Sequence, residues 1–177
     1  MAALATILGE TRPVSPLLRR ARSLGAGTLP ELLALAVARG CRHYSAATSE
    51  IASVRDPGRE ALSDEELAVL LLTDEHGSDP MAIRCAAQLL SGEHIDGARL
   101  AALAIRERCT RALAHIAEAG MAHDEKAPAF WRELRERLGA GVPVPEGGMP
   151  HWTRFVALSG VQRHSRRPTS VWLRPQR

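Results

Sequence analysis

The stretch from Asp96 to Gly120 has the apolar spacing of one long amphipathic helix. Asp96 is a suitable N-cap, because its carboxylate can accept hydrogen bonds from the free N–H groups of a first turn. Gly120 suits the left-handed residue just past a helix end. Leu100 and Leu103 lie on one side of this helix. The opposite face is formed by Ala98, Ala102, Ile105, Cys109, Ala112, Leu113 and Ile116. We therefore expect this helix to be buried on two sides and to form the centre of a helical bundle.

The composition favours helices over sheets. Hydrophobic residues make up 45% of the 177 residues, but aromatic residues make up only 3%. The core must therefore consist mainly of Leu, Ala, Ile and Val, and few runs are rich in the β-branched and aromatic residues that favour strands. The chain is long enough to form a core without disulfides or metal. We predict an all-α fold, a bundle of five to six helices with a small C-terminal β-hairpin.

Capping residues and glycines mark the other helices. The strongest start is the capping box of Ser63 and Glu66, with Leu62 and Leu67 at the hydrophobic staple positions. Asp64, Glu65 and Glu66 are explained by this cap and need no catalytic role. A short helix near residues 48–54 is expected before the turn at Asp56-Pro57-Gly58. The remaining predicted helices span about residues 16–24, 29–39, 64–73, 80–91 and 128–138.

The chain divides into three parts. Residues 12–138 form the helical bundle, and residues 139–150 (GAGVPVPEGGMP) form a Gly/Pro hinge. Residues 151–177 form a basic, aromatic β-hairpin, because the β-prone runs 153–161 and 169–173 flank a basic segment.

Charge is distributed unevenly between these parts. Residues 139–177 contain six arginines and one glutamate, a net charge of +5, whereas the other 138 residues have 17 basic and 19 acidic residues. Such asymmetry indicates an anionic partner for the C-terminal part. Arginines and exposed aromatic residues together can bind phosphates and stack on bases. The candidate contacts with nucleic acid are Arg154, Arg163, His164, Arg166, Arg167, Arg174, Trp152 and Trp172.

The alternative interpretation of this segment is structural, and we weigh it more heavily. A solvated turn would then carry the arginines, and Trp152 and Trp172 would pack the hairpin onto the bundle. Both interpretations remain open at the level of the sequence.

No motif in the sequence indicates catalysis or a cofactor. The histidines form neither an HExxH pattern nor a zinc-finger spacing, and Cys41-x-His43 is the one close pair of metal-ligating residues. Ser159 is not in a GxSxG elbow. The pairs Gly25/Gly27 and Gly139/Gly141 lack the lysine and serine or threonine of a phosphate-binding loop. We expect a protein that is not an enzyme and holds no metal or cofactor.

Cysteine usage and hydropathy bear on the compartment. The three cysteines, Cys41, Cys85 and Cys109, form no CxxC pair, and an odd number without a framework indicates a reducing compartment. No apolar run reaches about 18 residues, so we expect no membrane span. The N-terminus lacks the basic region of a secretory signal. We expect a cytoplasmic protein, with an organellar transit peptide around residues 12–22 as the alternative.

The string EALSDEELAVLLL at residues 60–72 resembles the opening of the small helical region of RadC-type proteins. A capped amphipathic helix produces such a string by itself, and the His-rich metal motif of the RadC catalytic domain is absent from the sequence. The resemblance therefore implies no function for this chain.

Two functions fit these observations. The first is a non-enzymatic binding module, or a small subunit of a larger complex, that contacts nucleic acid or another polyanion through the basic hairpin. The second is an assembly subunit whose basic loop meets an acidic protein surface without nucleic acid.

Overall fold

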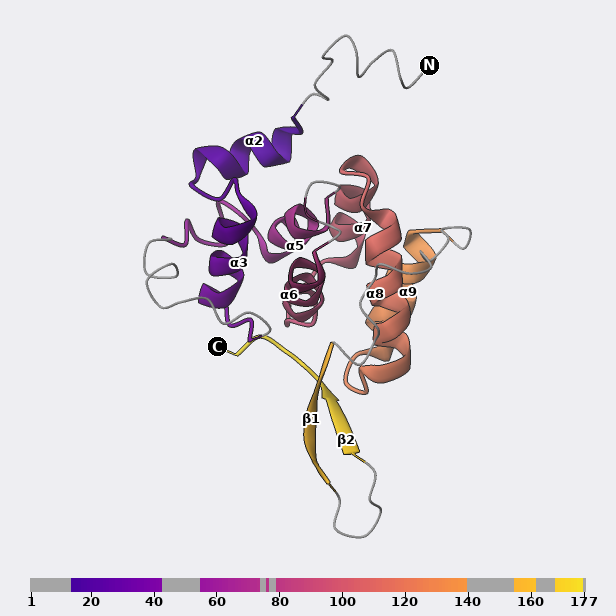
Figure 1. The fold of residues 1–177 in the computed structure, drawn as a ribbon. Coiled ribbons are helices and arrows are strands. Elements are labelled where there is room, and N and C mark those ends of the chain that lie inside the picture. The colour runs from indigo at the N-terminus through magenta and orange to yellow at the C-terminus, as the bar shows by residue number, and fades with distance from the viewer. Residues whose placement is uncertain are drawn as a thin grey trace, which may run out of the picture.

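The computed structural model describes residues 14–42, 55–73, 76, 79–139, 155–161 and 168–176, with the backbone alone at 157–161 and 168–170. This part of the chain is mainly helical, as the composition predicts, and its strands β1 and β2 pair antiparallel (Figure 1). The helices are α2 (Pro16–Ser23), α3 (Leu29–Ala38), α5 (Asp64–Leu72), α6 (Pro80–Leu90), α7 (Gly97–Arg106), α8 (Thr110–His123) and α9 (Pro128–Arg137), and the strands are β1 (Val156–Val161) and β2 (Pro168–Trp172). The predicted short helix at 48–54 and hinge residues 140–150 lie outside the described residues.

Local capping explains most of the helix starts. The Ser63 hydroxyl accepts a hydrogen bond from Glu66 N at 3.3 Å, and Ser63 N donates to Glu66 Oε2 at 3.0 Å, so the predicted capping box is confirmed. Asp79 caps α6 in a similar way, because its Oδ1 accepts from Met81 N at 2.7 Å and from Ala82 N at 3.2 Å.

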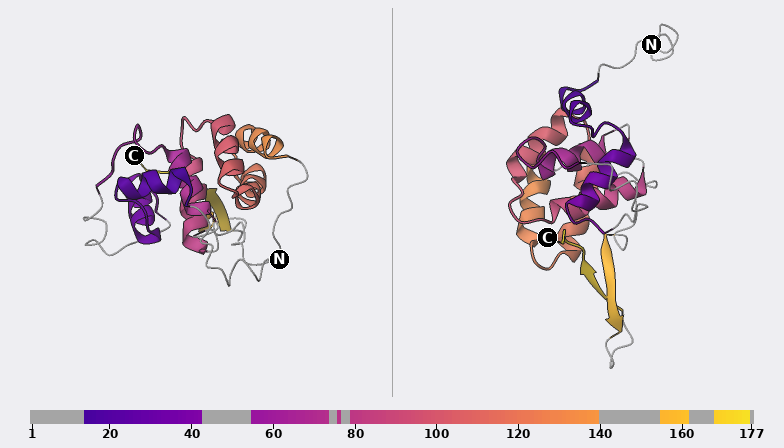
Figure 2. Two further views of the ribbon diagram at one scale, coloured as in Figure 1. Left: turned by 90° about the horizontal axis from the view of Figure 1, so that it is seen from above. Right: turned by 90° about the vertical axis from the view of Figure 1, so that its left-hand side faces the viewer.

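The centre of the molecule is α5, and the expectation that residues 96–120 form it was wrong. Every residue from Glu65 to Leu72 is buried, so α5 is enclosed on all sides. It contacts α6 along its length, α3 on one side and α7 on another, and α2 near its start. Viewed from above, α5 and α6 lie between the α2–α3 pair and the group of α7, α8 and α9 (Figure 2).

The predicted helix over 96–120 is two helices, which is a second correction. Helix α7 ends at Arg106 and α8 begins at Thr110, and Arg108 between them has φ of +60°. Because the break shifts the helical phase, the two halves of the predicted apolar face separate. In α8 Leu113 and Ile116 of that face are buried as expected and Ala112 is partly buried, whereas Ile105 in α7 is 58% exposed. Arginine is uncommon at positive φ, so the residue types give no sign of this turn.

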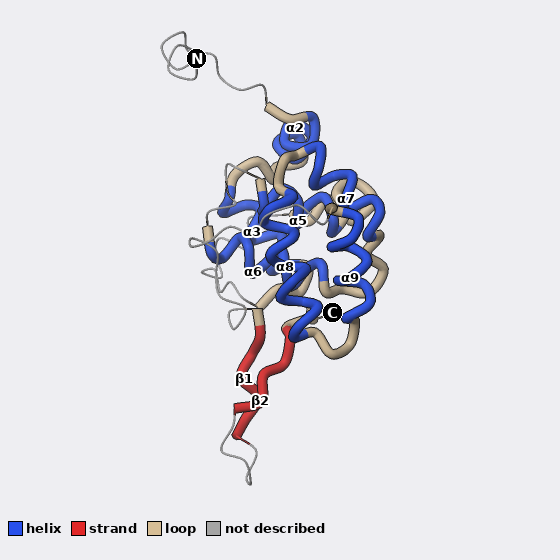
Figure 3. The backbone as a smooth tube through the Cα atoms, turned by 90° about the vertical axis from the view of Figure 1, so that its right-hand side faces the viewer, coloured by secondary structure: helices blue, strands red, loops and turns tan. Residues whose placement is uncertain are grey.

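The β-ribbon formed by β1 and β2 projects from one end of the helical body, and α2 lies at the opposite end (Figures 1 and 3). Val156 is opposite Trp172 in the ribbon, and Val161 is opposite Pro168, with an irregular register between Leu158 and Val161. The ribbon leaves the body beside the ends of α6 and α8, which therefore position it.

Candidate interface at the β-ribbon

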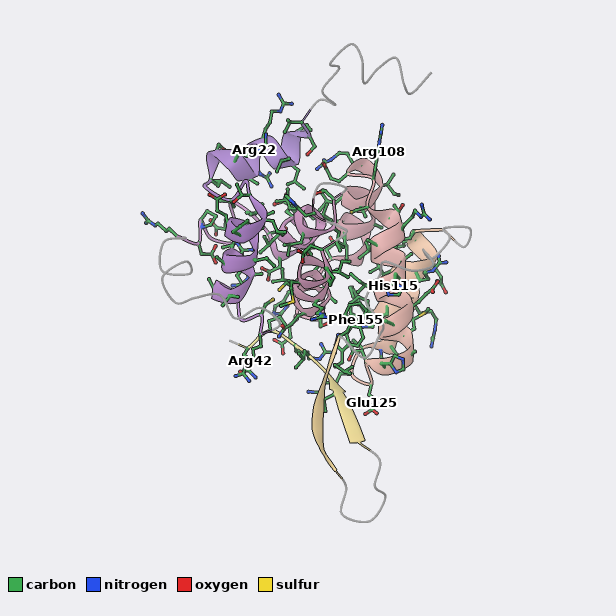
Figure 4. All side chains as sticks on the ribbon, in the orientation of Figure 1. Arg22, Arg42, Arg108, His115, Glu125 and Phe155 are labelled. Atoms are coloured by element: carbon green, nitrogen blue, oxygen red, sulfur yellow. The ribbon has the colours of Figure 1, made fainter. Side chains whose placement is uncertain are left out.

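Buried aromatic rings attach the ribbon to the helices. Phe155, just before β1, and Trp172, at the end of β2, are 1% and 5% exposed. Their ring centroids lie 5.6 Å apart, and Trp172 also contacts Trp131 of α9 at 5.7 Å. His115 of α8 meets the edge of Phe155 at 6.0 Å. Aromatic pairs at these separations stabilise a core beyond their buried area, so the start of the ribbon is part of the main core (Figure 4).

The end of α6 supplies a polar anchor for the same strand. Trp172 Nε1 donates a hydrogen bond to Ser91 Oγ, and the Ser91 hydroxyl donates to the Ala87 carbonyl at 2.7 Å. The indole N–H of a buried tryptophan needs such a partner. Ser91 thus fixes the orientation of Trp172, and with it the direction in which β2 leaves the body.

A buried ion pair lies directly after β2. Arg174 Nη2 donates to Asp124 Oδ1 at 2.6 Å and to Oδ2 at 2.7 Å, and Arg174 Nη1 donates to the Ser91 carbonyl. The Asp124 side chain is 1% exposed and also accepts from Trp131 Nε1 at 2.8 Å. One guanidinium therefore satisfies acceptors at the C-terminal ends of α6 and α8, where a positive charge is favourable.

Residues 173–176, which we call the C-terminal strap, continue across the body to the end of α3. Gln88 of α6 is buried, and its Nε2 donates to the Arg174 carbonyl at 2.8 Å. Gln176 N donates to the Gly40 carbonyl at 3.0 Å. Gly40 has φ of +96°, and a Cβ atom there would come 2.7 Å from Gln176 N, so only glycine fits this position.

The structure separates the candidate contact residues into two groups. Trp172 is buried in the core and Arg174 is paired with Asp124, so neither presents its side chain to a ligand here. The other candidates lie outside the described residues: Trp152, Arg154, Arg163, His164, Arg166 and Arg167. No local pattern in the sequence indicates the roles of Asp124, Gln88 and Ser91, because the residues that they hold in the ribbon and the strap are far away along the chain.

Two pockets flank the strap. One, of about 310 Å³, lies between residues 123–126 and 171–176, and the other, of about 400 Å³, lies between residues 91–93, Lys126 and Pro175. Both mix basic and acidic side chains, and Arg174 in their shared wall is already neutralised by Asp124. Arg174 therefore contributes no uncompensated charge to either pocket.

The acidic residues at the start of α5 form ion pairs in addition to the cap. Glu66 Oε1 accepts from Arg99 at 3.0 Å, and Glu66 Oε2 pairs with Arg20 of α2. Asp64 pairs with the buried Arg39 at 2.9 Å and with Arg59 at 2.8 Å. These carboxylates therefore join α2, α3 and α7 to α5.

The thiols and the metal-ligating residues show no reactive arrangement. Hydrogen bonding to the Cys85 side chain, together with burial, raises the pKa of the Cys41 thiol, so this sulfur stays protonated and is a poor nucleophile. No group of three or more His, Cys, Asp or Glu residues in the described ranges is placed to hold a metal ion. None of the helices that the structure describes is both long enough and apolar enough to cross a membrane.

Comparison with known proteins gives no relative. No protein-family model, curated protein or solved structure matches the chain.

Proposed function

We propose that the chain is a non-enzymatic binding module, or a small subunit of a larger complex, that contacts nucleic acid or another polyanion through the β-ribbon and the residues between its strands. The observation that supports this most is that the described contacts between the ribbon and the helices lie at one end of the ribbon. Phe155 and Trp172 are buried in the body, whereas Val171 is 50% exposed and the strands extend beyond the helices (Figure 3).

A projecting ribbon of this kind gains stability from a partner. Two strands alone are at best marginally stable in water, so a partner surface that packs along them is expected to stabilise the ribbon. The major groove of B-DNA admits a two-stranded ribbon. Arg163, Arg166 and Arg167 fall between the two strands in the sequence, and we assign the phosphate contacts to them. Arg174 is left out because its charge is neutralised by Asp124.

The exposed Val171 favours the second function, in which the ribbon meets an acidic protein surface. An apolar side chain adds no binding energy in a contact with phosphates, but it does when it is buried in a protein interface. The two functions differ in whether oligonucleotides bind at all.

Fluorescence anisotropy with labelled single- and double-stranded oligonucleotides at several salt concentrations tests the proposal. Each phosphate contact contributes about 0.7 to 0.9 to the slope of log affinity against log salt. The triple variant Arg163→Ala/Arg166→Ala/Arg167→Ala is therefore expected to flatten the slope by about 2 to 3.

The matched control removes the same charge from the opposite end of the molecule. Arg106→Ala/Arg108→Ala/Arg111→Ala should keep the parental slope, because these residues lie on α7, on α8 and in the turn between them. Absence of binding at low salt, or a ribbon variant with the parental slope, would leave the protein-assembly function as the better proposal.

A further inference from the structure

Helix α7 has apolar residues on two faces, and only one of them is packed. Its inward face is buried against α5, α8 and α9. The outward face carries Ala98, Ala102 and Ile105 at intervals of four and three residues, all of them exposed. Ile105 and Val171 are the two exposed large hydrophobic residues in the part of the chain that the structure describes. Ile105 is therefore not an isolated apolar residue on the surface. It belongs to an apolar stripe formed by Ala98, Ala102 and Ile105.

Arginines surround this stripe. The side chains of Arg99 and Arg106 are 50% and 58% exposed, although each pairs with a carboxylate. Arg108 and Arg111 follow in the turn and in the first turn of α8, are exposed, and pair with no carboxylate of the described residues. Figure 4 shows Arg108 at the end of the body opposite the ribbon.

The two carboxylates that pair with Arg99 and Arg106 are buried, whereas Asp96 at the start of α7 is exposed. The side chains of Glu66 and Glu107, which pair with Arg99 and Arg106, are 8% and 2% exposed. At the Ile105 end of this face the guanidinium groups of Arg106 and Arg108 are therefore exposed, while the carboxylate of Glu107 is buried. A partner that approaches this face meets an apolar stripe with positive charge along one side and at its end.

We propose that this outward face of α7, together with the α7–α8 turn, binds an acidic amphipathic helix of a partner protein. Ile105 would insert among the apolar side chains of that helix, and the small Ala98 and Ala102 allow a close approach of its backbone. Glutamates or aspartates beside its apolar face would pair with Arg106 and Arg108, and charge complementarity of this kind sets the choice of partner.

Two other occupants fit the face less well. A second copy of the chain would place the same arginines opposite one another, because a two-fold contact pairs a surface with itself. Nucleic acid would satisfy the arginines but would gain nothing from Ile105 and the alanines. The proposal does not depend on the ribbon, so it stands or falls separately from the proposed function.

The test uses the full-length chain and a fluorescein-labelled helical peptide with leucines along one face and glutamates on both sides of it. A second peptide carries lysine in place of every glutamate. Ile105→Ser should weaken binding of the glutamate peptide by about tenfold or more, as expected for a central apolar anchor. The matched control Val171→Ser removes the other exposed hydrophobic residue and should leave the affinity unchanged.

Charge reversal gives a second readout that does not depend on Ile105. Arg106→Glu/Arg108→Glu should lose the glutamate peptide and gain the lysine peptide, whereas the parent chain shows the opposite preference. Equal binding of both peptides by the parent, no binding of the glutamate peptide, or an affinity unchanged by Ile105→Ser would overturn the proposal. Dimerisation in sedimentation experiments that Ile105→Ser abolishes would assign the face to a second copy. Loss of oligonucleotide binding in Arg106→Glu/Arg108→Glu, with binding unchanged in Ile105→Ser, would assign the face to nucleic acid.

Discussion

Gly120 of α8 lies against the indole of Trp131 in α9. A Cβ atom at position 120 would come 2.5 Å from Trp131 Cγ and 2.6 Å from Cε2. The glycine is buried within α8. Trp131 is also fully buried, and its Nε1 donates a hydrogen bond to Asp124. The missing side chain therefore allows α8 and α9 to approach each other at the point where the core receives Trp172 of the ribbon.

Gly120→Ala is expected to destabilise the protein by about 1–3 kcal/mol, because the added methyl group must displace the indole from a packed core. The substitution would otherwise gain about 1 kcal/mol, since alanine is the better helix former. Urea unfolding followed by circular dichroism measures the difference in the free energy of unfolding.

Gly97→Ala is the matched control for this substitution. Gly97 is also in a helix, but a Cβ atom there would lie 3.5 Å from Phe130 Cε2, which is an ordinary contact. We expect this variant to be neutral or stabilised by about 0.4–1 kcal/mol, because alanine restricts the unfolded chain. A similar gain for Gly120→Ala would show that the indole moves aside at no cost.

This glycine shows why the sequence predicts some features and misses others. In the sequence Gly120 indicates a helix end, because glycine is common just past the last turn. In the structure it serves close packing against Trp131, which local spacing does not reveal. The start of α5 at Ser63, by contrast, was predicted correctly, because the cap and its partner Glu66 are three residues apart.

The contacts that hold the ribbon and the strap to the helices could not be predicted from local sequence patterns either, because they join residues far apart in the chain. Arg174 and Asp124 are 50 residues apart, and Gln88 is 86 residues from the carbonyl that it binds. The basic residues of the hairpin were found from composition and charge. The sequence therefore indicates the basic segment that we propose as the polyanion contact, but not that Arg174 pairs with Asp124 inside the fold.

Ile105 and Ile116 are expected to respond very differently to truncation. Ile116→Ala should cost roughly 2–5 kcal/mol, because the side chain is fully buried and its loss leaves a cavity. Ile105→Ala should stay within about 0.5 kcal/mol, because the residue is 58% exposed. Thermal or urea unfolding of both variants checks this, and equal losses would indicate one continuous helix in place of α7 and α8.

The ion pairs of Glu66 make stability depend on pH. Burial raises the pKa of this carboxyl group, but the hydrogen bonds from Arg20 and from the Ser63 N–H outweigh burial, and the pKa lies below the ordinary value of 4.5. A carboxyl group with a lowered pKa stabilises the fold above its unfolded pKa, and this contribution is lost as the pH falls toward the folded pKa. Glu66→Gln should therefore reduce stability at neutral pH and make the acid side of the stability profile shallower.

The control for this pH dependence is Glu133→Gln. Glu133 pairs with Arg137 at 2.6 Å, but its side chain is 62% exposed, and exposed pairs contribute about 0–1 kcal/mol. Its pH profile should follow that of the parent chain. Equal changes in both variants would mean that the acid sensitivity arises from overall charge and not from Glu66.

The Arg174–Asp124 pair is expected to show strong energetic coupling. Arg174→Ala leaves a carboxylate that is 1% exposed, with Trp131 Nε1 and the Lys126 N–H as its remaining donors. Removal of one partner from a buried pair costs about 3–5 kcal/mol, and the quarter exposure of Arg174 places this case near 3 kcal/mol.

The double variant Asp124→Asn/Arg174→Ala should be destabilised by about 1–3 kcal/mol less than the sum of the losses in its two single variants. A double-mutant cycle by urea unfolding gives this difference, and near-ultraviolet circular dichroism reports whether Trp172 keeps its packing. Additive effects, with the tryptophan signal unchanged in Arg174→Ala, would mean that Arg174 does not hold the ribbon to the helices.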